Sequence, residues 1–344
     1  MPADRSCQQA IKLGAPSAQS QTAANEWLRT WQQSHSDSNV FRRAMPTNHD
    51  DELSVAPRVP RRIIHTVDVN ASTFVSGSAL LTNWSSLNPE YDWHIFDDAD
   101  CNSFMDAVAT PQQRWAYQSL ATGAARSDLF RVIVLLYLGG VYADVDVELR
   151  RPLRTVLPPN ASMVMSPRVS TEWLMMEAGH PLLRVLAKSI VTNVQRQVDL
   201  WRADSPAKCS GIHGCVIGVT GPERFLLSFV LCARSLGCAV SLTYYPHFIS
   251  CANSSSEAMR ASRRCVDEEL VNRPHWRAAE LPHMVRGWDC GIAMHRHCVT
   301  NKKKGHWECS GADRRAGHPH YTDSRATFFR LDAPNVTRLG VRTL

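Results

Sequence analysis

The sequence predicts an α/β fold with a mostly parallel central sheet and helices on both faces. Short apolar runs at residues 61–67, 91–96 and 141–143 are typical of buried strands, and longer segments with helical periodicity separate them. Strands and helices that alternate along a chain form parallel sheets with crossovers on either face. With 344 residues, the chain can hold one large domain of this class or two small ones.

The composition is that of a globular protein, with 44% hydrophobic and 20% charged residues. The formal net charge of +6 is mild and is compatible with an anionic ligand or an acidic membrane surface. The dense basic run at residues 302–304 is short and has no interleaved aromatic residues. We therefore predict a solvated loop there, and no nucleic-acid partner.

The cysteine content predicts an oxidising compartment. Nine of the 11 cysteines follow residue 208, and no C-x-x-C pair points to a structural zinc site. An odd count leaves at least one thiol unpaired. Connectivity stays open, but three close pairs are suited to disulfides, namely Cys209/Cys215, Cys232/Cys238 and Cys251/Cys265.

N-x-S/T sequons point the same way, towards the secretory-pathway lumen. They begin at Asn70, Asn83, Asn160, Asn253 and Asn335. Against this, residues 1–57 hold no apolar run of signal-peptide or anchor length. Either the protein is not luminal, or it associates with the membrane through a segment that is not present in this chain.

The N-terminal residues 1–57 are rich in Gln, Ser, Asn, Ala and charge, so we expect a flexible tail or stem with a short helix at 24–33. The folded domain is expected at residues 58–310. It contains a polar, cysteine-bearing insertion around 250–285, and residues 311–344 form a C-terminal tail.

Several elements lead to the centre of the domain. Helices are expected at residues 76–86, 99–108, 111–120 and 124–138. Asp97 and Asp98 follow the second strand, where they either contact a ligand or cap the next helix; we favour a cap by Asp98. Thr122 is the expected N-cap of the fourth helix, and Gly139 its left-handed stop.

The stretch TGAARSDLFRVIVLLYLGGVYADVDVE, from Thr122 onward, holds the candidate site. Asp128 and Arg131 lie three residues apart, on one face of the helix, whose apolar residues form a stripe. Asp144 and Asp146 end the strand that follows. Residues two apart in an extended segment point the same way, so both carboxylates face one side and suit Mn²⁺ or Mg²⁺. The alternative is a solvated turn.

SDLFR, an apolar helix and GGVYADVDV together resemble the Asp-X-Asp core of glycosyltransferase family 32. The resemblance covers residues 58–225, with a fainter signal to residue 307. It implies a GT-A-type nucleotide-sugar-binding fold and a metal-dependent transferase that retains the anomeric configuration. The implied reaction moves a hexose from a nucleotide sugar to a glycan or glycolipid in the Golgi lumen. GDP-mannose is the favoured donor, with galactose, glucose or N-acetylglucosamine from UDP-sugars as alternatives.

The same resemblance implies roles for the core residues. Asp146 is a direct metal ligand, and Asp144 bridges metal, ribose and sugar. Arg131 binds the diphosphate or the sugar hydroxyls through its rigid fork of donors, and Asp128 holds donor hydroxyls. The alternative for Asp128 and Arg131 is a simple ion pair between residues three positions apart in the helix.

Flanking motifs extend the predicted site. RIIHT resembles the family's opening strand, which places His65 and Thr66 at the nucleotide; His65 is equally well explained as a core histidine. Thr220, in a T-G-P turn, is expected to cap a helix at residues 222–235 and to line the donor pocket. Glu172 is a candidate for the acceptor side.

The C-terminal half matches the family less well. Strands are expected at residues 162–166, 173–176, 239–249 and 288–296, and a helix at 181–197. His295 is expected to complete the metal site beside Asp146, with His297 as second choice.

Two other functions remain open on the sequence. A catalytically silent sugar- or nucleotide-binding relative would keep the fold without turnover, although the intact Asp-X-Asp argues against it. A Mg²⁺-dependent phosphoryl-transfer enzyme is the second, but the chain has no GxxxxGK[ST] loop.

Overall fold

A computed structural model describes residues 16–45, 57–67, 71, 79–145, 147–149, 152–155, 162–165, 171–203, 215–235, 238–241, 248–251, 293–295, 298–301 and 306–309. The α-helices are α2 (Ala18–Ser34), α4 (Ala79–Leu87), α5 (Asp98–Val108), α6 (Pro111–Ser119), α7 (Gly123–Leu138), α8 (Pro181–Arg202) and α10 (Pro222–Ser235). Two short helical turns are also present: the 3-10 turn η1 (Leu153–Thr155) and the π-helical turn η2 (Val216–Thr220).

The main sheet has six strands in the order β1-β3-β2-β4-β7-β6. They are β1 (Phe41–Arg42), β2 (Arg62–Thr66), β3 (Asp92–Phe96), β4 (Gly140–Ala143), β6 (Met163–Met165) and β7 (Trp173–Met176). The central strands β3, β2 and β4 are parallel, whereas β1, β7 and β6 join antiparallel. The predicted α/β fold is confirmed, but the sheet is mixed rather than mostly parallel, because three of its neighbouring strand pairs are antiparallel.

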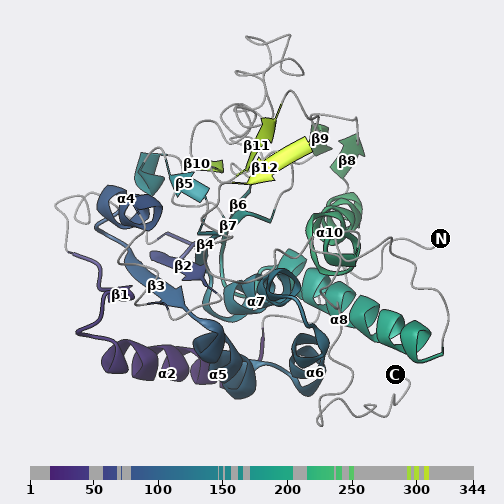
Figure 1. Ribbon diagram of the computed structural model, residues 1–344, viewed down its shortest axis with the longest axis horizontal. Helices are drawn as coiled ribbons and strands as arrows, with labels where there is room; N and C mark the ends of the chain where they lie inside the picture. The colour runs from purple at the N-terminus through teal and green to yellow at the C-terminus, as the bar shows by residue number, and fades with distance from the viewer. Residues whose placement is uncertain are drawn as a thin grey trace.

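Helices cover both faces of this sheet (Figure 1). Side chains alternate along β3, so Phe96 meets Trp27 of α2 at 5.5 Å between ring centroids and Phe130 of α7 at 6.2 Å. His65 of β2 meets Trp84 of α4 at 5.4 Å on the opposite face. The helices α2, α5 and α7 therefore pack on one face and α4 on the other, as expected for this class.

The helix α7 is buried on all sides, not along one stripe. Thirteen of its residues are buried between Ala125 and Leu138, because α2, α5, α6 and α8 surround it on the side away from the sheet. Its charged residues Asp128 and Arg131 are consequently inside the protein. Because neighbouring elements pack around α7, the charged side chains of this helix have little conformational freedom.

The prediction that residues 1–57 form a stem outside the fold is wrong for residues 18–42. Ala24, Leu28 and Trp31 of α2 are buried in the core, and β1 pairs with β3. Trp31 stacks edge-on against Phe96 at 4.7 Å between centroids. Three apolar residues on one face of a mostly polar helix are therefore enough to pack that helix against the rest of the domain.

The predicted caps of α7 are confirmed, and the predicted cap of α5 is shifted by one position. Thr122 accepts a hydrogen bond from the Ala125 backbone, and Gly139 ends α7 with φ of 64°. At α5 the cap is Asp97, not Asp98; Asp97 forms a capping box with Asp100. Asp98 instead pairs with Arg126 of α7 at 2.6 Å.

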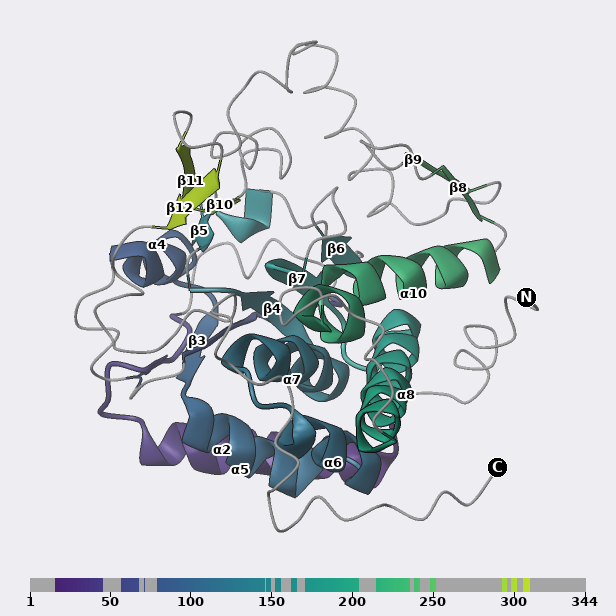
Figure 2. The same cartoon turned by 45° about the vertical axis from the view of Figure 1, so that its right-hand side comes forward.

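Beyond α10 the described residues form two hairpins and one added strand (Figure 2). The strands β8 (Cys238–Ser241) and β9 (Phe248–Cys251) pair antiparallel, where one continuous strand had been predicted. The second hairpin joins β11 (Cys298–Asn301) to β12 (His306–Cys309). Between them in sequence, β10 (Ala293–His295) pairs with β5 (Val147–Leu149).

The predicted insertion at 250–285, apart from the end of β9, and the C-terminal tail at 311–344 lie outside the described residues. Within the part of the chain that is described, every helix is too short or too polar to cross a lipid bilayer.

Candidate functional site

The site lies where β4 ends, between β2 and β7. All four residues of β4 are buried, and the strand stops at Ala143. The Val147 N–H donates to the Asp144 carbonyl at 3.0 Å, and the Asp144 N–H donates to the Glu172 carbonyl at 2.8 Å. Asp144 thus begins a tight turn rather than continuing the extended strand that was predicted through it. Asp146 itself lies outside the described residues.

Two glycines allow α7 to lead directly into β4. Gly139 and Gly140 have φ of 64° and 110°, in the region that favours glycine. A Cβ on Gly140 would lie 2.3 Å from Cγ of Arg62, so no larger residue fits beside β2. The tight reversal predicted from this pair is confirmed, and it brings Asp144 back beside α7.

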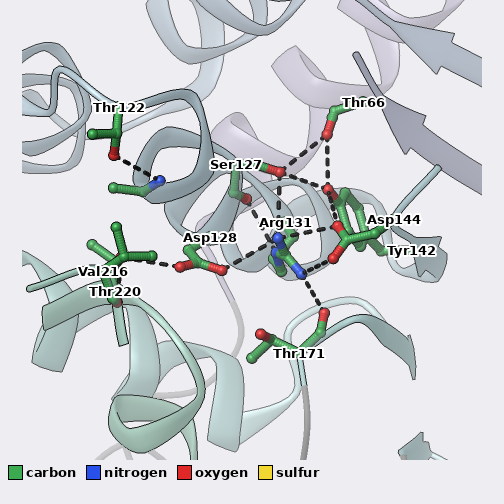
Figure 3. Close-up of polar contacts among 11 residues, drawn as sticks. Thr66, Thr122, Ser127, Asp128, Arg131, Tyr142, Asp144, Thr171, Val216 and Thr220 are labelled. Carbon is green, nitrogen blue, oxygen red and sulfur yellow. Dashed lines mark hydrogen bonds and ion pairs between the residues drawn. The ribbon is translucent and has the colours of Figure 1, made fainter. Parts of the chain in front are cut away.

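Arg131 lies beside the carboxylate of Asp144 and contacts both of its oxygens (Figure 3). Its Nη1 and Nη2 lie 3.2 and 3.1 Å from Oδ2 and Oδ1 of Asp144, a two-point contact. The Tyr142 hydroxyl donates to Oδ1 at 3.1 Å. The arginine side chain is 5% exposed and the aspartate 27%, so the carboxylate is fixed from inside the protein and reaches solvent at the site.

All five N–H donors of Arg131 have protein acceptors. Besides Asp144, the guanidinium contacts Oδ1 of Asp128 at 3.2 Å, the Ser127 carbonyl at 3.3 Å and the Thr171 carbonyl. Burial alone would lower the pKa of Arg131, but the carboxylate of Asp144 and that of Asp128 raise it above its ordinary value. Arg131 is therefore a permanent cation whose donors are directed at the protein rather than at a diphosphate.

Asp128 is the second carboxylate on this guanidinium. It is buried, and burial raises its pKa against the opposing effects of Arg131 and the Thr220 hydroxyl. Asp128 and Arg131 were predicted to share a helix face, and they do. The i,i+3 ion pair that was the alternative to a donor contact is present, and both of its side chains are buried.

Thr220 fixes the other oxygen of Asp128. Its Oγ1 lies 3.1 Å from both Asp128 Oδ2 and the Val216 carbonyl, inside the π-helical turn η2. A Cβ on Gly221 would lie 2.8 Å from the Val216 carbonyl and 3.0 Å from Asp128 Oδ2. The T-G-P turn therefore serves to seat Asp128. The Thr220 hydroxyl is directed at Asp128, not at the start of α10 where a cap had been predicted.

Three hydroxyls meet on the sheet side of Asp144. The Thr66 and Ser127 hydroxyls each lie 2.8 Å from the Tyr142 hydroxyl, and 3.1 Å from each other. Burial raises the pKa of Tyr142, and the Arg131 guanidinium lies over its ring at 4.7 Å. Thr66, predicted at the nucleotide, is half-buried and joins this group. Ser127 and Tyr142 were not predicted, although Tyr142 stands two residues before Asp144, on the same side of β4.

His65 takes the core position that was the alternative to a nucleotide contact. Its ring is fully buried, and burial lowers its pKa to about 4, so the imidazole is neutral. Nδ1 lies 2.8 Å from the Ala143 carbonyl and donates to it. His65 thus holds the backbone of the residue that precedes Asp144.

The strand after the turn is held by α4. Trp84 Nε1 donates to the Val147 carbonyl and Asn83 Nδ2 to the Leu149 carbonyl, each at 2.6 Å. Asn83, counted among the sequons, thus donates a hydrogen bond from its amide nitrogen to the backbone of β5. The other four sequon asparagines lie outside the described residues.

His295, the predicted metal ligand from the C-terminal half, lies in β10, which pairs with β5. In the β5–β10 pair, the Cα partner of His295 is Val147, the residue directly after Asp146. His297 lies outside the described residues. Among the described side chains, no three His, Cys, Asp or Glu residues form a metal-binding group. The residues present still fit a hard divalent cation, because Asp144 offers a fixed, partly exposed carboxylate, and the backbone of β10 pairs with β5 three residues after it.

Comparison with known proteins supports a glycosyltransferase. Residues 77–163 match the family described as glycosyltransferase sugar-binding region containing DXD motif. That span includes α4, α7 and Asp144, and the predicted resemblance to the Asp-X-Asp glycosyltransferases is thereby confirmed.

Two curated fungal proteins are similar over shorter stretches. The initiation-specific alpha-1,6-mannosyltransferase of Candida albicans is 28% identical over 72 residues, 20% of this chain and 19% of that protein. The putative glycosyltransferase HOC1 of Saccharomyces cerevisiae is 24% identical over 141 residues, 34% of this chain and 36% of that protein. The chain thus spans about a fifth and about a third of the lengths of these relatives.

Among solved structures, the PaToxG glycosyltransferase is similar over 62% of this chain and 78% of its own, at 14% identity and a TM-score of 0.38. This score is too low to equate the two folds.

Proposed function

We propose that this chain, whose residues 77–163 carry a DXD-type glycosyltransferase region, is a metal-dependent retaining glycosyltransferase of GT-A type. It transfers a hexose from a nucleotide sugar to a glycan or glycolipid acceptor. The observation that carries the proposal is the Asp144 carboxylate, which a buried arginine and a tyrosine hold at the solvent-facing end of β4. Preorganised groups of this kind are typical of sites that bind a charged ligand.

Asp144, Asp146 and His295 would hold Mn²⁺ or Mg²⁺ in the proposed enzyme. A divalent cation bound there supplies Lewis-acid neutralisation of the leaving diphosphate. In the protein itself, Arg131 and Tyr142 fix the carboxylate of Asp144. This carboxylate therefore does not have to change its orientation when the donor binds. Thr66 and Ser127, both half-buried beside Asp144, are candidates for contact with donor hydroxyls.

Asp128, Arg131 and Thr220 act mainly as positioning residues in this proposal. They form one buried chain from η2 through α7 to Asp144, with contacts of 3.1 to 3.2 Å. The substitution Arg131→Lys keeps the charge but loses the fork. We expect it to raise the Mn²⁺ concentration for half-maximal rate about tenfold, as changes behind a metal ligand do. A purely structural role would lower the amount of folded enzyme and leave that concentration unchanged.

Mannose from GDP-mannose is the favoured donor, because one of the two similar curated proteins is named as a mannosyltransferase. Glucose, galactose or N-acetylglucosamine from UDP-sugars are the alternatives. The Golgi or another part of the secretory-pathway lumen is the proposed location, in keeping with the family resemblance and the cysteine content. A peripheral or anchored association with the membrane fits that location.

The second candidate is a catalytically silent sugar- or nucleotide-binding relative. Release of nucleotide from a panel of GDP- and UDP-sugars, each with Mn²⁺ and with EDTA, separates the two functions. Cleavage of one donor that requires the metal supports the transferase and identifies the donor. Stereochemistry follows from the anomeric proton of the product in NMR spectra, where retention is expected.

Asp97→Asn is the matched control in this assay, because Asp97 caps α5 and has no part in the site. If the folded protein leaves every donor intact, with and without candidate acceptor glycans, the transferase proposal fails and the silent relative replaces it.

A further inference from the structure

Both C-terminal hairpins place one cysteine directly opposite another. In β8–β9 the Cα partners include Cys238 and Cys251, and in β11–β12 they include Cys298 and Cys309. Each pair occupies the outermost position of its ladder, where the first residue of one strand meets the last residue of the next. The backbone register alone establishes this placement.

Chance is a poor explanation for the coincidence. Nine of the 136 residues after residue 208 are cysteine, so the residue opposite a given cysteine in this region is itself a cysteine about 7% of the time. Two independent hairpins with this feature are expected about once in two hundred such cases, since about 7% multiplied by itself is about 0.5%. The pairs therefore require a common cause.

The spacing meets the geometric requirement of a disulfide. Directly opposite residues in an antiparallel ladder have Cα atoms about 4.5–5.5 Å apart, and disulfides join Cα atoms about 4.4–6.8 Å apart. The loops that would be closed, residues 238–251 and 298–309, are short and lie within one hairpin each. Neither cross-link needs a rearrangement of the strands.

We propose that Cys238–Cys251 and Cys298–Cys309 are cross-strand disulfides that close the open ends of these hairpins. Each forms by thiol–disulfide exchange with an oxidised dithiol oxidoreductase or oxidised glutathione. Two protein thiols lose two protons and two electrons to form one S–S bond, and the donor disulfide takes them up as two thiols. This pairing replaces the expected pairs Cys232/Cys238 and Cys251/Cys265.

The second disulfide has a consequence for the site. The strand β11 starts at residue 298, three positions after His295, whose Cα partner is Val147 beside Asp146. A cross-link at the base of β11–β12 fixes the segment that follows β10 and so limits the freedom of β10 against β5. This part of the inference rests on the proposed function, whereas the pairing itself does not.

Peptide mapping tests the pairing directly. The full chain would be produced in a secretory-pathway host, alkylated without reduction, digested and analysed by mass spectrometry. We expect linked peptides that contain Cys238 with Cys251 and Cys298 with Cys309. Alkylation of these four cysteines, or linkage of either pair to other cysteines, overturns the proposal. Cys101 is the internal control, because it is buried and free and should be alkylated only after denaturation.

A pair of double variants tests the link to the site. Cys298→Ser with Cys309→Ser should raise the Mn²⁺ concentration for half-maximal donor cleavage about tenfold, as loss of support behind a metal ligand does. Cys238→Ser with Cys251→Ser removes the matching bond from the hairpin that does not adjoin β10, and should leave that concentration unchanged. An equal effect of both variants, or no effect of either, refutes the link. If the wild-type chain cleaves no donor, the proposed function fails, while the peptide map still decides the pairing.

Discussion

Replacing Arg131 with methionine should destabilise the protein strongly and in a pH-dependent way. Methionine fills a similar volume, so the cavity contribution is small. The change leaves Asp128, with a side chain 7% exposed, and the half-buried Asp144 without their shared cation. Breaking a buried ion pair on one side costs about 3–5 kcal/mol in the free energy of unfolding, and the partial exposure of Asp144 puts our expectation at the lower end, about 3 kcal/mol.

The pH dependence follows from Asp128. Burial already raises its pKa, and loss of Arg131 removes the main opposing effect, so the pKa rises further in the variant. A carboxyl group whose pKa is higher in the folded than in the unfolded state binds more protons when folded. The variant therefore loses stability as the pH rises from the unfolded pKa of about 3.9 to the raised folded value. Its deficit relative to wild type should be largest at neutral pH and shrink on acidification.

Urea unfolding at several pH values, followed by fluorescence of the buried tryptophans, measures both effects. The double variant Arg131→Met with Asp128→Asn should recover about 1–3 kcal/mol of the loss, because the buried charge is gone. Arg126→Met on the same helix is the matched control. Its partner Asp98 is 42% exposed, so we expect a loss of about 1 kcal/mol or less from the ion pair. Equal and pH-independent losses for Arg131→Met and Arg126→Met would refute the account of a buried charge network.

Three further predictions concern the packing around this network. Trp31→Ala should lower the free energy of unfolding by about 3–5 kcal/mol, because Trp31 of α2 is buried against Phe96 of the sheet; an unchanged urea midpoint would show that α2 is a separate stem. Gly221→Ala should cost about 1–3 kcal/mol and slow donor cleavage, since its Cβ would lie 3.0 Å from Asp128 Oδ2; normal stability and rate would contradict the close approach. Burial lowers the pKa of His94 to about 3 and that of His65 to about 4. The unfolded chain therefore binds protons at these two residues below about pH 6.5, while the folded protein does not. For each histidine, the free energy of unfolding falls by about 1.4 kcal/mol per pH unit as the pH drops below that value. His94→Gln should reduce that slope in urea titrations between pH 7 and pH 5, and an unchanged slope would mean that His94 is protonated in the folded state.

Local sequence signals predicted the local features of the site. The cap at Thr122, the stop at Gly139 and the shared face of Asp128 and Arg131 each depend on residues a few positions apart, and all three are confirmed. The strand-helix-strand order likewise gave the parallel centre of the sheet. These features are set by helix and turn chemistry within single segments.

Contacts between distant segments were not predictable in the same way. The hydrogen bond from Thr220 to Asp128 joins residues 92 positions apart, and the hydrophobic pattern of neither segment predicts it. Burial of Trp31 was missed because the surrounding segment is polar. The three apolar residues of α2 are buried only because the helix packs against α5, α7 and Phe96 of β3. The turn at Asp144 was missed because its sequence is β-prone on both sides, so that propensity favours a continuous strand.

The central claim is that Asp144 and Asp146 hold a divalent cation on which donor cleavage depends. The most direct test is the initial rate of nucleotide release from the preferred donor as a function of Mn²⁺ concentration, for wild type, Asp144→Asn and Asp146→Asn. We predict a saturable rise for wild type that EDTA abolishes, and rates near background for both folded variants at every Mn²⁺ concentration. Wild-type cleavage that persists in EDTA, or Mn²⁺ saturation that is the same in all three proteins, would contradict the claim.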